Sequence, residues 1–322
     1  MDLIPATVLT GFLGSGKTTL LNKILTKQSD RKIAVIVNEF GEIGIDNELI
    51  VDAEEDTIMM SNGCICCKFR GDIIRTIHDI LRRPEPFEAL VIETTGLADP
   101  GPIAQSFFVD DELKAKVRLD AIVTVVDAKH ISMHLEKGRE AHEQIAFADV
   151  TLLNKSDLVS PEILADLRKK VRAMNLATKI YETQNTEIDL DKILGIGAFD
   201  LSRRVEVSPD FFDAKGEHLD KEIRSISIRQ EGELDGKKFN GWLGNLLKEK
   251  GMDIFRMKGL VQVQGEKRRV VFQGVHMMFD GKPDRPWEPE EDRTNRMVFI
   301  GRNLPEEEIR AGLKACLATT QN

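Results

Sequence analysis

A glycine-rich segment, Gly11-Phe12-Leu13-Gly14-Ser15-Gly16-Lys17-Thr18, constrains the fold of this chain more than any other feature. It fits the pattern G-x-x-x-x-G-K-[ST], follows a β-branched run at residues 7–9 and precedes an amphipathic stretch at residues 20–25. In a strand, loop and helix of this kind, backbone N–H groups curl around phosphate oxygens and the helix N-terminus favours negative charge. The segment therefore predicts a nucleotide-binding α/β domain.

The side chains of this loop have separate predicted tasks. Lys17 is expected to reach the β- and γ-phosphates, and Thr18 to offer its hydroxyl to Mg²⁺. Thr19 is placed to donate toward the α-phosphate. The remaining phosphate contacts are expected from Gly11, Gly14, Ser15 and Gly16.

The first half of the chain alternates short apolar runs with amphipathic stretches. Strands are predicted at residues 7–9, 33–37, 89–92, 121–126 and 150–153, and helices at 20–25, 72–81 and 163–174. Runs this apolar are typical of strands that are buried on both faces. Because strands and helices alternate, we expect right-handed crossovers and a mostly parallel sheet.

A chain of 322 residues is long enough for this domain and a smaller companion. Around residues 202–220 the pattern gives way to charges with Pro209 and Gly216. We therefore predict a P-loop GTPase domain at 1–202, a linker at 203–220 and a second domain at 221–322. In the second domain, strands at 223–228, 259–263, 270–275 and 297–300 and helices at 239–247 and 306–317 indicate an α+β fold.

Composition excludes several classes of function. Hydrophobic residues make up 41% and charged residues 31% of the chain, and no apolar run approaches the roughly 18 residues of a membrane-spanning helix. The start of the chain lacks a basic region before an apolar one, so we expect a cytoplasmic protein without a membrane partner. A net charge of −9 without a basic block argues against nucleic acid as the partner.

The tetrapeptide Asn154-Lys155-Ser156-Asp157, which follows an apolar run, indicates which base is bound. A carboxylate at Asp157 can accept hydrogen bonds from the N1–H and N2–H₂ edge of guanine. Adenine offers no such pair of donors and would leave the carboxylate unsatisfied. With the phosphate loop on the same chain, the motif predicts GTP rather than ATP, and we expect Asn154 and Lys155 to belong to the same site.

Two acidic residues end predicted strands between these motifs. Glu93 lies where P-loop proteins usually place an acid for Mg²⁺, with Gly96 toward the γ-phosphate. Asp127 ends the next strand and is interpreted as a further candidate or as a cap of the helix that follows.

The tetrapeptide Cys64-Ile65-Cys66-Cys67 holds three of the four cysteines of the chain. In a reducing compartment these are thiols or metal ligands before they are disulfides. Soft thiolates at this spacing suit Zn²⁺, Cu⁺ or cobalt, and a fourth ligand must come from elsewhere. A redox pair and small buried residues are the alternatives.

An acidic loop upstream is a candidate source of that fourth ligand. Glu39 follows the second predicted strand, with Glu42 and Asp46 further on, and could bind Mg²⁺ or the thiolate-bound metal. A solvated charged loop is the alternative. Cys316, alone in an amphipathic stretch, is expected in the core, and His130 and His134 are expected to be ordinary helix residues.

Together these segments resemble the CobW family of GTPases, which is related to the maturation GTPases UreG and HypB. The matching segments are residues 10–21, 38–42, 63–67, 93–100 and 154–157, followed by 256–259, 273–275, Trp287 and 298–302.

The resemblance implies a slow GTP hydrolase that delivers Zn²⁺, or Co²⁺ in the cobalamin pathway, to a client apo-metalloprotein. Lys17, Thr18 and Glu93 are the residues predicted for catalysis, and the resemblance implies Cys64, Cys66 and Cys67 as metal ligands. It leaves a homodimer open. A GTP-regulated insertase or activator of a metalloenzyme is an alternative, as is a redox-sensing GTPase. In the favoured mechanism GTP raises metal affinity and hydrolysis releases the metal.

Overall fold

The computed structural model describes residues 3–28, 31–39, 58–63, 70–199 and 223–319. Contacts divide the chain into two compact units. One is built from Met1–Lys169 and Thr178–Phe199, and the other from Lys170–Ala177 and Asp200–Asn322. The linker at 203–220 lies outside the described residues, so the predicted domain boundaries stay a prediction.

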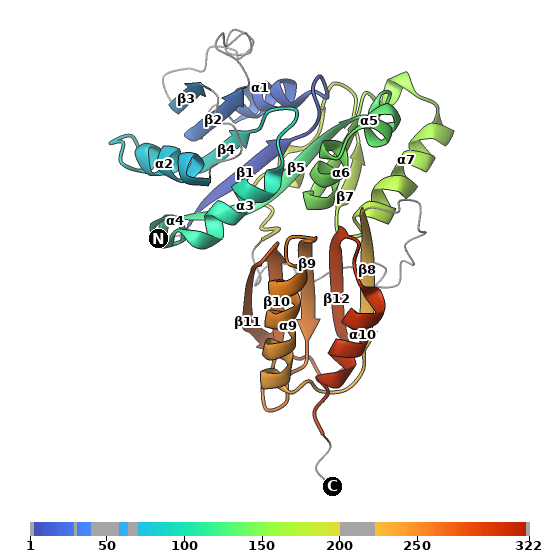
Figure 1. The fold of residues 1–322 in the computed structure, drawn as a ribbon. Helices are drawn as coiled ribbons and strands as arrows, with labels where there is room; N and C mark the ends of the chain where they lie inside the picture. The colour runs from blue at the N-terminus through green and yellow to red at the C-terminus, as the bar shows by residue number, and fades with distance from the viewer. Residues whose placement is uncertain (1–2, 29–30, 40–57, 64–69, 200–222, 320–322) are drawn as a thin grey trace. The chain divides into compact units, whose positions relative to one another are not determined.

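The first unit is built on a parallel sheet of seven strands in the order β3-β2-β4-β1-β5-β6-β7 (Figure 1). The central strands have apolar residues on both faces because helices cover the sheet on both sides. The strands are β1 (Ile4–Thr10), β2 (Ile33–Glu39), β3 (Ile58–Gly63), β4 (Ala89–Glu93), β5 (Val117–Asp127), β6 (Val150–Asn154) and β7 (Lys179–Glu182). The predicted α/β P-loop fold is confirmed.

The helices of this unit pack on the sheet through buried aliphatic side chains. Leu20, Leu21 and Ile24 of α1 share one core cluster with Leu9 of β1 and Val123 of β5. Helices α3 and α6 contact β5, and α2 contacts α3. The helices are α1 (Lys17–Lys27), α2 (Arg70–Leu81), α3 (Pro100–Val109), α4 (Asp111–Lys116), α5 (Ile131–Lys137), α6 (Glu140–Phe147) and α7 (Pro161–Met174), with short 3₁₀ turns η2 (Ser156–Leu158) and η3 (Leu190–Lys192).

The second unit contains an antiparallel sheet of five strands, in the order β11-β10-β9-β12-β8, and its described residues also form the helices α9 and α10 (Figure 1). Side chains of α9 and α10, such as Phe239 and Leu313, share one core cluster with Met257 and Phe299 of the sheet. This confirms the predicted smaller α+β domain. Its elements are β8 (Ile223–Gln230), α9 (Gly236–Lys250), β9 (Ile254–Val261), β10 (Arg268–Val275), β11 (Met278–Pro286), β12 (Asn295–Arg302) and α10 (Glu306–Ala315).

No helix within the described ranges is both long enough and apolar enough to span a bilayer.

The parallel sheet brings separate sequence motifs to one edge. Because all seven strands run the same way, their carboxyl ends lie together. The glycine-rich loop follows β1, Glu93 ends β4, Asp127 ends β5 and Asn154 ends β6. In the β2–β3 pair, Glu39 is the register partner of Gly63, the residue before Cys64. This edge is therefore where the predicted site residues are to be sought.

Candidate functional site

The glycine-rich loop has the backbone geometry that phosphate binding requires. It joins β1 to α1, and Gly11, Gly14 and Gly16 have φ values of 139°, 72° and 113°. A Cβ on Gly16 would lie 2.7 Å from Asn154 Nδ2, so β6 closes directly against the loop. The loop thus places consecutive N–H groups at the start of α1, where the helix dipole favours an anion.

Lys17 and Thr18 contact neighbouring parts of the same edge. Lys17 is buried and its Nζ donates to Phe12 O at 3.3 Å. Thr18 Oγ1 donates to Glu93 Oε1 at 2.8 Å, and Glu93 is only 5% exposed. The hydroxyl and the carboxylate that were each predicted for Mg²⁺ therefore lie within one hydrogen bond of each other. Thr19 is exposed in the first turn of α1.

Two buried hydroxyls test whether this edge fits a ligand. Within the part of the chain that the structure describes, Ser15 Oγ and Thr95 Oγ1 are buried and have no hydrogen-bond partner. A buried hydroxyl left in this state costs free energy that an incoming oxygen or its hydration shell can recover. Together with the Thr18–Glu93 pair, these groups fit a phosphate chain with its Mg²⁺.

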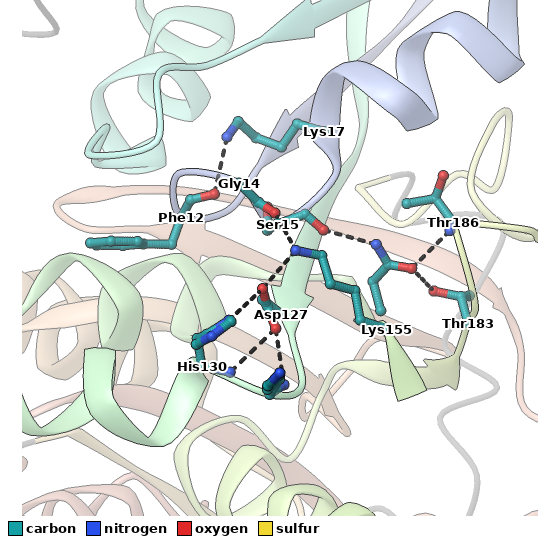
Figure 2. A network of polar contacts seen from close by, with 11 residues as sticks. Phe12, Gly14, Ser15, Lys17, Asp127, His130, Lys155, Thr183 and Thr186 are labelled. Atoms are coloured by element: carbon teal, nitrogen blue, oxygen red, sulfur yellow. Dashed lines mark hydrogen bonds and ion pairs between the residues drawn. The ribbon is translucent and has the colours of Figure 1, made fainter. Parts of the chain in front are cut away.

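The side-chain amide of Asn154 forms hydrogen bonds with three neighbouring protein residues. Its Nδ2 donates to Ser15 O at 2.8 Å, and its Oδ1 accepts from Thr186 N at 2.8 Å and from Thr183 Oγ1 at 3.1 Å (Figure 2). Asn154 is 2% exposed. Its amide therefore ties the phosphate loop to the end of β6 and to the loop after β7.

Lys155 is partly buried, whereas Asp157 is exposed. Lys155 has φ 60° and its Nζ reaches back to Gly14 O at 2.8 Å and to Asp127 Oδ2 at 2.8 Å. Asp157, in η2, is exposed and so can accept hydrogen bonds from a base.

Asp127 caps the turn after β5 and not the helix that follows, because the N-cap residue of α5 is His130. Its Oδ1 accepts from Lys129 N at 2.9 Å and from His130 N at 3.2 Å. Burial works to raise the pKa of Asp127, but hydrogen bonds from Lys155 and His130 outweigh it and leave that pKa lowered. The carboxylate is therefore held in its charged form beside the phosphate loop.

Sequence reasoning missed the loop after β7. Asn185 and Thr186 both have left-handed backbones, with φ values of 48° and 57°. A β-branched residue seldom adopts this conformation, and such strain persists where the surroundings impose it. The signal in the sequence, a Gln-Asn-Thr turn, is too common to single out without the contact of Thr186 with Asn154.

Two residues expected to be ordinary also contact the site. The His134 ring stacks on Phe12 of the phosphate loop, with ring centroids 3.9 Å apart. The His130 ring nitrogen Nδ1 lies 3.0 Å from Asp127 Oδ2. Both side chains come from the first turns of α5 or just before it, so this helix braces the loop.

The predicted metal ligands Cys64, Cys66 and Cys67 lie outside the described residues, as do Glu42 and Asp46. Of Glu39, the structure gives the backbone at the end of β2. Within the described ranges no group of three or more His, Cys, Asp or Glu side chains could hold a metal ion. Cys316 is buried in the second unit, as expected, and its Sγ donates to Gly312 O at 3.2 Å.

Comparison with known proteins accounts for both units. Residues 5–182 match the family model described as CobW/HypB/UreG, nucleotide-binding domain, and residues 223–317 match the cobalamin synthesis protein cobW C-terminal domain. The zinc chaperone YjiA of Escherichia coli is 38% identical over 97% of this chain and 98% of its own length. The zinc-regulated GTPase metalloprotein activator 1 of Schizosaccharomyces pombe is 34% identical over 94% of this chain and 84% of its own.

A solved structure agrees with these relatives. The crystal structure of Zn(II)-bound YjiA GTPase from E. coli aligns with 99% of this chain and 100% of its own, at 34% identity and a TM-score of 0.77. The matched ranges include the glycine-rich loop, Glu93, Asp127, the tetrapeptide at 154–157 and the second sheet. The chain therefore belongs to the CobW/HypB/UreG family, as a nucleotide-binding domain followed by the cobW C-terminal domain.

Proposed function

We propose that this protein is a GTP-dependent zinc chaperone. It binds GTP at the edge formed by the β1–α1 loop and the end of β6, and Zn²⁺ through Cys64, Cys66 and Cys67. It hydrolyses GTP slowly to GDP and phosphate, and it delivers the metal to a client apo-metalloprotein. The names of its full-length relatives, zinc chaperone and zinc-regulated GTPase metalloprotein activator, support this assignment.

The observation that carries the proposal is the register of two neighbouring strands. Glu39 at the end of β2 pairs with Gly63 at the end of β3, and the cysteine tetrapeptide follows Gly63 at once in the sequence. On its other side β2 pairs with β4, which ends at Glu93 beside Thr18. The end of β4, beside Thr18, is therefore separated in the sheet from the end of β3, where the cysteine tetrapeptide begins, by the single strand β2.

The residues of the edge divide the work of GTP hydrolysis. Thr18 and Glu93 would hold Mg²⁺, which when bound neutralises charge on the β- and γ-phosphate oxygens. Lys17 balances the charge that develops on the transferred phosphoryl group. Asp157 accepts the N1–H and N2–H₂ donors of guanine. These residues orient the nucleotide and neutralise its charge.

Metal binding and nucleotide binding are coupled in this proposal. GTP raises the affinity for Zn²⁺, and hydrolysis lowers it again. By reciprocity Zn²⁺ must tighten GTP binding by the same factor, roughly 5- to 150-fold for couplings of ordinary size. Thiolates favour zinc over cobalt, so Co²⁺ remains the secondary cargo.

A competitive Zn²⁺ titration of the reduced protein, with and without Mg²⁺ and a non-hydrolysable GTP analogue, tests the proposal. We expect the nucleotide to tighten Zn²⁺ binding at least fivefold, and Cys66→Ser to abolish that gain. Cys316→Ser is the matched control, because this buried thiol lies in the second unit. Equal Zn²⁺ affinity in both nucleotide states would refute a GTP-gated chaperone. The same titration with Co²⁺ compares the two cargoes.

A further inference from the structure

The carboxylate of Asp127 makes more contacts than a turn cap needs. While Oδ1 accepts the two backbone N–H groups of the turn, Oδ2 accepts from Lys155 Nζ at 2.8 Å and lies 3.0 Å from His130 Nδ1 (Figure 2). The Asp127 side chain is 8% exposed and that of Lys155 is 33% exposed. The carboxylate thus joins the end of β5 to the guanine motif after β6.

Lys155 is held at both of its ends. Its backbone adopts φ 60°, and its Nζ also donates to Gly14 O at 2.8 Å. The four-carbon stem therefore runs along a fixed line from the guanine motif to the phosphate loop. Gly14 O alone is a neutral acceptor, whereas Asp127 adds a charge-assisted hydrogen bond, which is about twice as strong.

We propose that Asp127 is a positioning residue for the nucleotide: it holds the Lys155 ammonium so that the lysine stem forms one wall for the purine base. The inference rests on the proposed binding of GTP. Asp157 reads the edge of the base, and the stem of Lys155 supports its face. An apolar stem that packs on a ring does not distinguish one purine from another, whereas Asp157 does. The two residues therefore have different effects on specificity.

The test compares three ligands on the full-length protein: GTP, inosine triphosphate, which lacks the N2 amino group, and inorganic tripolyphosphate, each with Mg²⁺. We expect Asp127→Asn to raise the dissociation constants for GTP and inosine triphosphate by the same factor, roughly tenfold to a hundredfold. Tripolyphosphate binding should stay within about twofold of wild type, because the phosphate loop itself is intact. Asp157→Asn should instead weaken GTP more than inosine triphosphate.

Lys155→Met is the second variant, because it keeps the length of the stem and removes the ammonium. We expect it to weaken GTP binding as Asp127→Asn does, and the double variant to be no weaker than the poorer single variant. A purely structural role of Asp127 would instead make the two losses multiply. That result would overturn the inference. Wild-type affinity in Lys155→Met would overturn it as well, and this measurement does not require Asp127→Asn to fold.

Asp110→Asn is the matched control. Asp110 also accepts a helix N–H, from Leu113 N at 2.8 Å, and a histidine, with His78 Nε2 at 3.0 Å. It precedes α4, which leads into the amino end of β5, where Val117 pairs with Ile4. Asp110→Asn should leave all three dissociation constants unchanged.

The inference and the proposed function fail in different ways. A wild-type protein that binds GTP, beside an Asp127→Asn variant that binds it equally well, overturns the inference alone. Tripolyphosphate binding that falls along with GTP in that variant does so too. A wild-type protein that binds no guanine nucleotide overturns the proposed function and the inference with it.

Discussion

At Gly16 the backbone and the neighbouring side chains leave no room for a Cβ. The φ of 113° is strained for any other residue, and an added Cβ would lie 2.7 Å from Asn154 Nδ2 and 3.1 Å from Thr186 Cγ2. Gly14 also has a positive φ, of 72°, but an added Cβ there meets nothing within 4 Å. The two glycines therefore separate the cost of backbone strain from the cost of a steric clash.

We expect Gly16→Ala to weaken GTP binding at least about a hundredfold. The added methyl group would displace the Asn154 side-chain amide, which donates to Ser15 O in the phosphate loop. Gly14→Ala should cost about 1 kcal/mol of left-handed strain, with less than about tenfold loss of affinity. Isothermal titration with a GTP analogue and urea unfolding of both variants measure the two effects. Similar losses in both variants would contradict this account of Gly16.

The thiol of Cys316 should be unreactive in the folded protein. It is 2% exposed, and burial raises its pKa above the ordinary thiol value. In a variant that carries serine at positions 64, 66 and 67, a thiol reagent at pH 8 should modify Cys316 on the order of a hundredfold more slowly than in denaturant. Equal rates in the two conditions would show that this end of α10 opens readily.

At the scale of elements, a charged contact holds the loop after β7 against α1. Lys23 Nζ donates to Asn185 O and to Glu187, each at 2.6 Å, and Lys27 donates to Glu187 as well. These hydrogen bonds lower the pKa of Glu187 to about 2. Since the same loop contacts Asn154 through Thr186, the contact links the helix of the phosphate loop to the guanine motif.

The sign of the pH dependence follows from this pKa. A carboxylate with a folded pKa of about 2 and an ordinary value of 4.5 stabilises the folded state above pH 4.5 and loses that contribution as pH falls toward 2. We expect the difference in unfolding free energy between wild type and Glu187→Gln to shrink over this window. Urea unfolding at pH 7, 4 and 3 measures it. Because the pair is exposed, 1 M salt should also reduce the difference. A constant difference would rule out the contact as its source.

The sequence predicted those elements whose buried surface gives a regular pattern. The β-branched runs of β1, β2, β4, β5 and β6 were identified because these strands are apolar on both faces. Strand β7 is a four-residue edge strand with partly exposed side chains, and β11 carries Gly281, Pro283 and Pro286, which are tolerated at a sheet edge. Helix α3 is buried on nearly all sides, so it shows no amphipathic period.

The residues of the candidate site were also predictable only where they belong to a local sequence pattern. The phosphate loop and the guanine tetrapeptide are fixed local patterns, so Lys17, Thr18 and Asn154 were found from the sequence. Thr183 and Thr186 join the site only through long-range hydrogen bonds, which leave no local pattern. The predicted role of Asn154 in the site is better described as a link between loops, since both ends of its amide contact the protein.

At the scale of the whole molecule, the two units have separate hydrophobic cores. A ligand that binds only the folded form of one unit stabilises that unit by mass action. The gain is about 2.7 kcal/mol when the ligand concentration is a hundred times its dissociation constant. We expect Mg²⁺ and a GTP analogue to slow hydrogen exchange in peptides that cover residues 8–20, 150–158 and 178–186, all in the first unit. Exchange in residues 223–315 should stay unchanged. Equal protection of both regions would show that the nucleotide stabilises the chain as one cooperative body.

The place of β3 in the sheet suggests how cargo selection could change without loss of the GTPase. Among the strands that the structure describes, β1 and β4 are each paired on both sides, whereas β3 is paired with β2 alone. An edge strand is the part of a sheet that tolerates replacement best, since only one ladder must be re-formed. The proposed metal ligands Cys64, Cys66 and Cys67 follow this strand in the sequence. A protein engineer could therefore replace the cysteines after Gly63 with histidine, aspartate or glutamate. Such a change would alter the metal preference and leave the GTP-binding residues unchanged.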